Sequence, residues 1–316
     1  MNFVTPEQPQ PRWRPAESSR PIDSGSERII DLTRILAAMR DFIAILLLLA
    51  ATFPLRSNVH VRAHGFLARP ASRNLLASEV MGYSCPHCLN GGGVDEVSQG
   101  GALQWPRGLR TLSGDRVSDE SPRAFEAGGE FYTGSVGGNY TQGSIVDFRV
   151  TLTTNHNGRF LFRICRVPGG YDDAVKMEAN ELNEQCLDQN VLRQANVKGA
   201  QMPGEPWFYT LPEDAGKSVE YEMPYQLPQD LVCDGVDSHC VLQWYWLTFN
   251  SCQTSDAPAR FTRVANNMAM CDDPTASYPE EFSNLADIRI LRTAGLQAHP
   301  ALASVLVAVG LLFVGL

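Results

Sequence analysis

Three segments of this chain alternate apolar and polar residues with a period of two, and this pattern constrains the fold most strongly. They cover residues 145–152, 160–164 and 241–249, and the last of them is dense in aromatic and β-branched residues. A period of two places successive side chains on opposite faces of an extended strand. Frequent glycine and proline residues favour short strands joined by turns over long helices. We therefore predict an all-β fold.

Two further segments complete the predicted fold. Asn155-His156-Asn157-Gly158 lies between the first two strands, and Asn-Gly readily adopts the positive φ that a tight hairpin turn requires. Residues 171–195 are the one stretch with helical composition, and we expect them to lie in a loop. Many short strands of this kind are typical of a β-sandwich. The prediction is therefore a β-sandwich with loop and short-helix insertions.

The N-terminal part resembles a targeting segment. Residues 1–38 are polar and rich in Pro, Ser and Arg, so we expect a disordered or untranslated extension. Residues 39–63 combine a charged start, an apolar middle that is short for a membrane span, and Val61 and Ala63 at the −3 and −1 positions of a cleavage site. We predict a secretory signal peptide that is cut after Ala63. The alternative is a signal anchor that is never cut.

The C-terminal part is also apolar. Between residue 64 and about residue 290 there is no linker and no repeat, so we predict one domain over 64–290. Residues 291–316 end in an apolar run that resembles the discarded tail of a GPI-anchored precursor. The alternatives are a C-terminal membrane anchor and a buried strand. The protein is thus expected to be secreted or held at the extracellular cell surface.

All eight cysteines follow the predicted cleavage site, and an even number in an exported chain indicates disulfides. Cys85-Pro86-His87-Cys88 has the spacing of half a zinc site, but no second half follows. Asn139-Tyr140-Thr141 is an acceptor for N-glycosylation, which fits the same compartment. Proximity in the sequence suggests the pairs Cys165–Cys186, Cys233–Cys240 and Cys252–Cys271.

Charge and motifs exclude several classes of function. The net charge of −9 and the pI near 5.2 argue against nucleic acid as the partner, whereas a neutral polysaccharide meets no electrostatic difficulty. A glycoside hydrolase needs two carboxylates across a cleft, but Glu280 and Glu281 are adjacent and would face opposite ways on a strand. The sequence also lacks G-x-S-x-G, H-E-x-x-H and a Gly-rich phosphate loop.

Histidines carry the candidate chemistry. Cleavage after Ala63 would expose both the α-amine and the imidazole of His64, which can chelate one metal ion. His156 in the predicted turn would add a third nitrogen, and Cu(II) prefers nitrogen-rich tetragonal coordination. The free amine has a pKa of only about 7.7–8.0, so copper can displace its proton near neutral pH. Phe282 could cap an axial side of this copper, although an isolated turn histidine is usually solvated and an aromatic is usually a core residue.

Four segments resemble the chitin-binding type 4 group, the lytic polysaccharide monooxygenases, and are most similar to its animal-type and bacterial branches. They occur in the family's order and span the predicted domain. The segments are HGFLARPASRN (64–74), TTNHNGRFLFRIC (153–165), LQWYWLTFNSCQ (242–253) and EEFSNLADIRI (280–290).

This resemblance implies an immunoglobulin- or fibronectin III-like β-sandwich with one copper ion in a flat, exposed site. His64 and His156 match the copper ligands, and Phe282 matches the axial aromatic. The implied activity is oxidation of a C–H bond beside a glycosidic link in insoluble chitin or cellulose. It requires O₂ or H₂O₂ and an external electron donor, and the protein is expected to be a monomer.

The sequence departs from the family's pattern in places. Leu285 stands where a cysteine is common, and residues 85–93 and 171–190 look specific to this chain. Gln243 lies on a strand that supplies polar groups in related branches, and Thr154 would shape the open axial side. Two alternatives remain: a non-catalytic surface protein that binds chitin or a cell wall, and a copper-handling protein without a polysaccharide-binding face.

Overall fold

The computed structural model describes residues 64–262 and 268–293. The predictions for residues 1–63 and for the end of the tail, 294–316, lie outside the described residues. Within the described part, no helix is long and apolar enough to cross a membrane.

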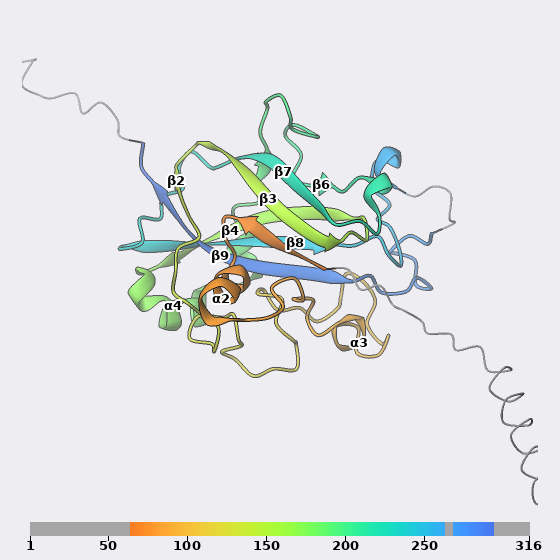
Figure 1. Cartoon of the computed structure of the whole chain (residues 1–316), viewed down its shortest axis with the longest axis horizontal. Helices are drawn as coiled ribbons and strands as arrows, with labels where there is room; N and C mark the ends of the chain where they lie inside the picture. Colours follow the sequence, from red (N-terminus) through yellow and green to blue (C-terminus); the bar gives the residue numbers. More distant parts are fainter. Residues whose placement is uncertain (1–63, 263–267, 294–316) are drawn as a thin grey trace, which may run out of the picture. The chain divides into compact units, whose positions relative to one another are not determined.

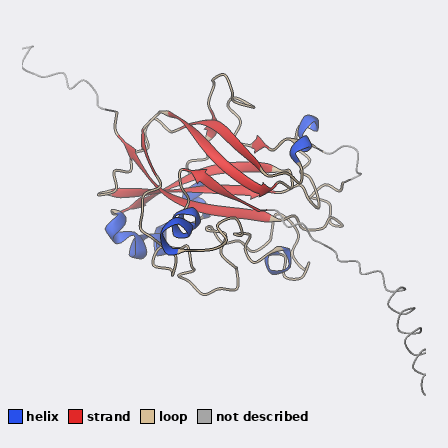
Figure 2. Cartoon of the chain, in the orientation of Figure 1, coloured by secondary structure: helices blue, strands red, loops and turns tan. Residues whose placement is uncertain are grey.

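Within the described residues, nine strands form two sheets that pack face to face (Figures 1 and 2). The four-stranded sheet has the order β1-β3-β7-β5, with β1 at His64–Arg69, β3 at Ile145–Thr154, β7 at Val219–Gln226 and β5 at Arg193–Gln194. The five-stranded sheet has the order β2-β9-β8-β4-β6, with β2 at Gly138–Thr141, β9 at Glu281–Leu291, β8 at Ser238–Leu247, β4 at Arg159–Pro168 and β6 at Phe208–Tyr209. The predicted immunoglobulin-like sandwich is confirmed, and so are its three predicted strands.

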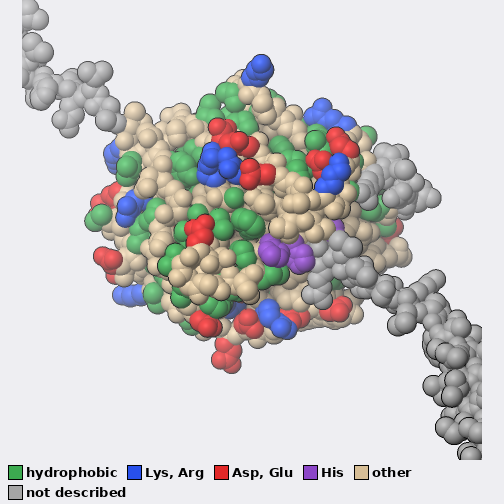
Figure 3. Space-filling view, in the orientation of Figure 1, with side chains coloured by type: hydrophobic (Ala, Val, Ile, Leu, Met, Phe, Trp, Pro, Cys, Tyr) green, Lys and Arg blue, Asp and Glu red, His purple; other side chains and the backbone are tan. Residues whose placement is uncertain are grey.

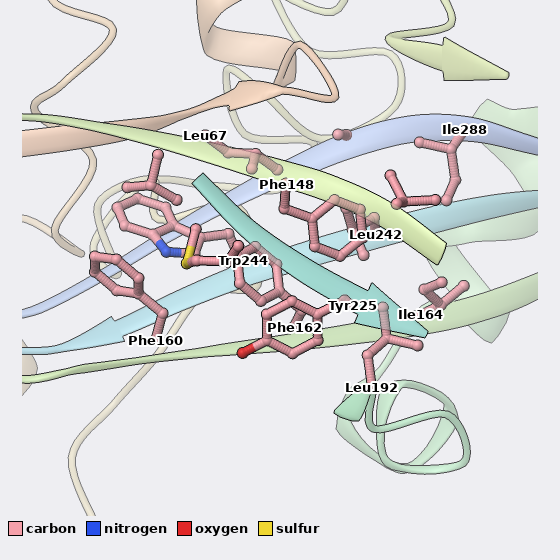
Figure 4. Packing of buried hydrophobic residues seen from close by; sticks show 14 of the residues in the cluster. Leu67, Phe148, Phe160, Phe162, Ile164, Leu192, Tyr225, Leu242, Trp244 and Ile288 are labelled. Carbon is pink, nitrogen blue, oxygen red and sulfur yellow. The ribbon is translucent and has the colours of Figure 1, made fainter. Parts of the chain in front are cut away.

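The core lies between the two sheets. Along β3 every second residue is buried, as a period of two requires. Aromatic side chains from both sheets meet there, and the rings of Phe148 and Phe162 have their centroids 4.8 Å apart (Figure 4). Trp244, Trp246 and Phe282 are fully buried or nearly so in the same cluster. Each such side chain stabilises the fold by about 1.5–3 kcal/mol through burial.

Short helices pack against strands of the five-stranded sheet. Helix α2 packs on β9, and helices α4 and α5 pack on β4. The last two fall within residues 171–195, so the predicted helical insertion is confirmed. The helices are α2 at Arg73–Met81, α3 at Val94–Val97, α4 at Ala174–Glu181 and α5 at Glu184–Asp188, and short 3₁₀ turns lie at Tyr171–Asp173, Pro212–Asp214 and Ala259–Phe261.

The predicted hairpin turn at 155–158 is wrong in one respect. Strand β3 pairs with β1 and β7, whereas β4 pairs with β8 and β6, so the segment passes from one sheet to the other. Asn157 and Gly158 do have positive φ values of 59° and 109°. Asn-Gly therefore makes a sharp change of direction, but between layers rather than between paired strands. We call residues 155–158 the arch.

All three predicted disulfides are present, and a fourth joins Cys85 to Cys88. With both sulfurs in that bond, neither cysteine is a thiolate ligand, which argues against a zinc site at this motif. Leu285, which replaces the cysteine common in the family, is 1% exposed and packs in an apolar cluster with Cys165 and Val241.

A buried group of charges connects the helices to β9. The guanidinium of Arg73 on α2 contacts Asp287 on β9 at 2.6 Å and Glu178 on α4 at 2.7 Å. His239 on β8 lies 3.3 Å from Glu178, and all four residues are buried. Buried carboxylates require such partners, since an unpaired charge in the interior is costly. The group therefore fixes α2 and α4 on the outer side of the five-stranded sheet.

Candidate metal centre

His64 is the first residue of β1 and pairs with Thr154 near the end of β3. The next residue, Gly65, packs so closely against Leu152 that a side chain would not fit, since a Cβ at this position would lie 2.4 Å from the Leu152 side chain. Its backbone N–H also donates to the carbonyl of His87 at 3.1 Å. The main chain directly after His64 is thus fixed on two sides.

His156 lies in the arch, two residues after the partner of His64. Its Nδ1 is 3.0 Å from Glu280 Oε2, and Asn250 Nδ2 donates to the same oxygen at 2.9 Å. The side chains of His156 and Glu280 are only 13% and 10% exposed. In the tautomer with the proton on Nδ1, this carboxylate accepts that proton and Nε2 is the nitrogen that could bind a metal.

Phe282 follows Glu280 by two residues and is 1% exposed. Its ring lies 5.0 Å from that of Trp246, whose Nε1 donates to the carbonyl of Asn157 in the arch at 2.9 Å. Strand β9 therefore contributes Phe282, with Glu280 just before it, beside the segment that holds His156. The aromatic at this position is thus a buried phenylalanine, which has no ionisable group.

The strand order and pairing place the three predicted site residues at the same end of the sandwich, where β1 begins, β3 ends and β9 begins. Strand pairing connects His64 with the arch, and Glu280 connects the arch with Phe282. The donors fit copper: two imidazoles and, if the chain is cut before His64, one amine form a nitrogen-rich set. Glu280 also supplies the outer hydrogen bond that metal-binding histidines usually make.

His87, which the sequence placed only in half of a zinc motif, is a further candidate ligand beside His64. His64, His87 and Cys88 each offer one donor atom, and these atoms lie within 4.8 Å of one another. The rings of His64 and His87 meet edge to face with centroids 5.0 Å apart, and histidine side chains gather on one face in Figure 3. Burial lowers the pKa of His87, which favours the neutral imidazole that a metal requires. His156 is not a member of this group.

Gln243 and Glu281 form hydrogen bonds with residues other than the candidate ligands. Gln243 Oε1 accepts from Arg163 Nε at 3.0 Å, and its Nε2 donates to the carbonyl of Leu112 at 3.0 Å. Glu281 accepts from Arg110 Nε at 2.9 Å, whereas its neighbour Glu280 contacts His156. The adjacent carboxylates therefore face opposite ways, as predicted for a strand.

A cavity of about 450 Å³ borders Glu280. Its lining is rich in amide, hydroxyl and carboxylate groups, which can exchange hydrogen bonds with sugar hydroxyls. The residues include Asn90, Asp95, Asn250, Ser251, Tyr278 and Glu280.

Comparisons with known proteins identify the family that this chain resembles. A family profile described as "Lytic polysaccharide mono-oxygenase, cellulose-degrading" matches residues 64–288. The solved structure of a lytic polysaccharide monooxygenase AA15 from Thermobia domestica in the Cu(I) state is similar, with 28% identity and a TM-score of 0.51. The similarity covers 72% of this chain and 99% of that chain. No curated protein matches the sequence.

Proposed function

Because this chain belongs to the lytic polysaccharide monooxygenase family and is a copper-dependent oxidoreductase, we propose that it cleaves glycosidic links in insoluble chitin or cellulose. The observation that carries this proposal is the family match from His64, the first ligand candidate, to residue 288. We propose one copper ion held by the α-amine and imidazole of His64 and by His156. When bound by these residues, copper would supply one-electron redox chemistry toward O₂ or H₂O₂, with electrons from an external donor.

The residues around these histidines have separate roles in the proposal. Glu280 holds the His156 ring through Nδ1, so that Nε2 is presented to the metal. Phe282 keeps water from one side of the site, because its buried ring has no polar atom. The polar cavity beside Glu280 would bind sugar hydroxyls and hold a C–H bond close to the reacting centre.

The proposal extends to the location of the protein. Export with cleavage after Ala63 is required, because the His64 amine is otherwise part of a peptide bond. The family match begins at His64, and all eight cysteines lie beyond this point, which supports export. Asn139 is exposed on β2 and is available as a glycosylation acceptor. We propose a monomer that is secreted or held at the cell surface by a C-terminal anchor.

Copper titration of two forms tests this function. One form is the mature chain that begins at His64, and the other carries one extra alanine before it. We expect one-to-one Cu(II) binding with a tetragonal, nitrogen-rich EPR spectrum in the first form, and much weaker binding in the second. Chitin and cellulose are then incubated with the copper form, a small-molecule reductant and O₂, and mass spectrometry detects oxidised oligosaccharides.

Each outcome has a distinct meaning. Equal, weak copper binding in both forms would contradict the proposed copper site. Tight copper binding that requires the free amine, with no oxidised product from either polymer, would favour copper handling. Tight adsorption to chitin without copper binding would favour a non-catalytic surface protein.

A further inference from the structure

The Cys85–Cys88 turn carries a histidine that the proposed copper site does not use. The donor atoms of His64 and His87 lie in one group of atoms that are within 4.8 Å of one another, and their rings are in edge-to-face contact. Two nitrogens on one metal ion are at most about 4 Å apart when each bond is about 2.0 Å long. Small side-chain rotations would therefore bring both rings to a single ion.

The main chain around His87 is held from three directions. The disulfide closes the turn, and the N–H of Cys88 donates to the carbonyl of Cys85 at 3.1 Å. The buried amide of Asn74 on α2 donates to the carbonyl of Pro86. The carbonyl of His87 accepts from Gly65, the neighbour of His64. A donor held on such a frame loses little conformational entropy when it binds a ligand.

Other partners compete only weakly for the His87 ring. Its Nε2 lies 3.4 Å from Cys85 Sγ, and a sulfur atom is a weak hydrogen-bond acceptor. Cys88 belongs to the same donor group, but its sulfur is in the disulfide and is not a thiolate. The disulfide thus removes a soft ligand from the group and leaves two imidazoles.

We propose that His87 is an additional imidazole ligand of the metal ion bound at His64, so that this copper site contains a histidine from the Cys85–Cys88 turn. The inference rests on the proposed copper function. With His87 as a ligand, this centre would differ from a site made by His64 and His156 alone. An added nitrogen donor would strengthen binding of a metal that prefers nitrogen ligands.

Pulsed EPR on the copper-loaded mature chain tests this assignment, because the remote nitrogen of each bound imidazole contributes to the modulation. The variants are His87→Phe, which keeps a ring without a donor, and His87→Ala, which also removes the ring. Ser84→Ala, at the exposed position just before this turn, is the matched control. A His156→Ala variant identifies the second ligand independently. Near-UV circular dichroism and mass spectrometry of the Cys85–Cys88 disulfide check that each variant is folded.

We expect both His87 variants to lose one imidazole from the pulsed EPR signal and the control to keep it. Loss of a hydrogen-bond partner of a ligand typically lowers metal affinity by about 10–100-fold. Loss of a ligand itself should lower copper affinity by at least as much. An unchanged imidazole signal and unchanged affinity in folded His87→Phe would overturn this assignment, while tight wild-type binding would leave the proposed function intact. Loss of polysaccharide adsorption with an unchanged copper spectrum would also overturn it, since His87 would then contact substrate only.

Two outcomes separate this inference from the proposed function. If the mature wild-type chain does not bind copper, the proposed function fails and this assignment fails with it. If the His87 variants lose copper but His156→Ala does not, the assignment of His87 stands and the proposed role of His156 is wrong.

Discussion

At the scale of single residues, the proposed metal site depends on the contact between Glu280 and the imidazole of His156. Its carboxylate contacts His156 Nδ1, and Asn250 donates to the same oxygen, so the carboxylate itself is held in place. Glu280 also borders the polar cavity. The sequence indicated that Glu280 and Glu281 face opposite ways, but it did not show which of them meets the histidine.

Replacement of Glu280 by Ala should weaken copper binding. His156 would lose the acceptor that fixes its tautomer and ring orientation, and such losses typically lower metal affinity by about 10–100-fold. Isothermal titration of the mature chain with Cu(II) measures the change. Glu79→Ala, on the exposed surface of α2, controls for the loss of one negative charge. Equal affinities in the two variants would show that Glu280 does not orient a ligand.

The buried charges around His239 give a prediction about pH. Burial by itself lowers the pKa of His239, but the Glu178 carboxylate, the Gly169 carbonyl and the charge of Asp287 raise it more, so the net pKa lies above its ordinary value. With Arg73 the two carboxylates leave one uncompensated negative charge, which protonated His239 neutralises. Tyr171, whose ring is 5.1 Å away, also faces the imidazole.

A histidine whose pKa is raised in the folded state stabilises the protein most at low pH, where the imidazole is protonated. This contribution is fully present below the ordinary pKa of about 6.5 and is lost as pH rises through the raised value. We expect the free energy of unfolding of the wild type, measured in urea relative to His239→Gln, to decrease as pH rises above about 6.5. A difference between the two proteins that is independent of pH would contradict the assigned charge of His239.

His64, His156 and Phe282 could be proposed from the sequence because each lies in a segment with a family signature, and their roles at a metal ion remain predictions. The contact between His87 and His64 could not be predicted, although the motif that contains His87 was visible. The CPHC motif has no partner along the sequence, and its partner in space, His64, lies at the start of β1 more than a strand's length away along the chain. A spacing rule searches along the chain, whereas this contact depends on how the turn packs against β1.

At the scale of elements, the arch shows what a period of two cannot determine. The alternation identified the strands on both sides of residues 155–158, and Asn-Gly identified the positive φ. Alternation does not state which sheet a strand joins, however, because both sheets bury one face in the same core. The arch places His156 at the edge of the sandwich, between the sheet that holds His64 and the sheet that holds Phe282.

Gly158→Ala should disturb this arch. Gly158 has φ of 109°, and a Cβ there would lie 2.0 Å from the backbone carbonyl oxygen of Leu247. Strain from such a φ alone costs about 1–3 kcal/mol, and the clash with main chain adds to it. The free energy of unfolding should fall by more than this, and copper affinity should fall with it because His156 would be displaced.

Gly199→Ala is the matched control for this prediction. Gly199 has a similar φ of 102°, but a Cβ there would meet no atom of the described residues within 4 Å. Urea denaturation should therefore give a smaller loss in this variant, and copper binding should be unchanged. Equal losses of stability in the two variants would mean that the approach of Leu247 to the arch has no energetic consequence.

At the scale of the whole molecule, the sandwich brings together segments that are far apart in the sequence. Leu67 N on β1 donates to Asn284 Oδ1 on β9 at 3.0 Å, which connects the two sheets near the site. The fold class could be predicted because strand patterns and family signatures are distributed along residues 64–290. The loops at residues 85–135 could not be predicted, because their conformation depends on contacts with distant parts of the chain, such as that of Arg110 with Glu281.

The acidic charge of the chain leads to a last prediction about substrate binding. With a net charge of −9, the chain should be repelled by an anionic polymer. A neutral polysaccharide would instead be held by hydrogen bonds and apolar contacts. Such binding releases few counterions, so adsorption to chitin or cellulose should change by less than about twofold between about 50 and 500 mM NaCl. Depletion from solution over the washed polymer measures this, with heparin beads as the anionic comparison. A steep loss of adsorption with salt would instead indicate a charged ligand and would count against a neutral substrate.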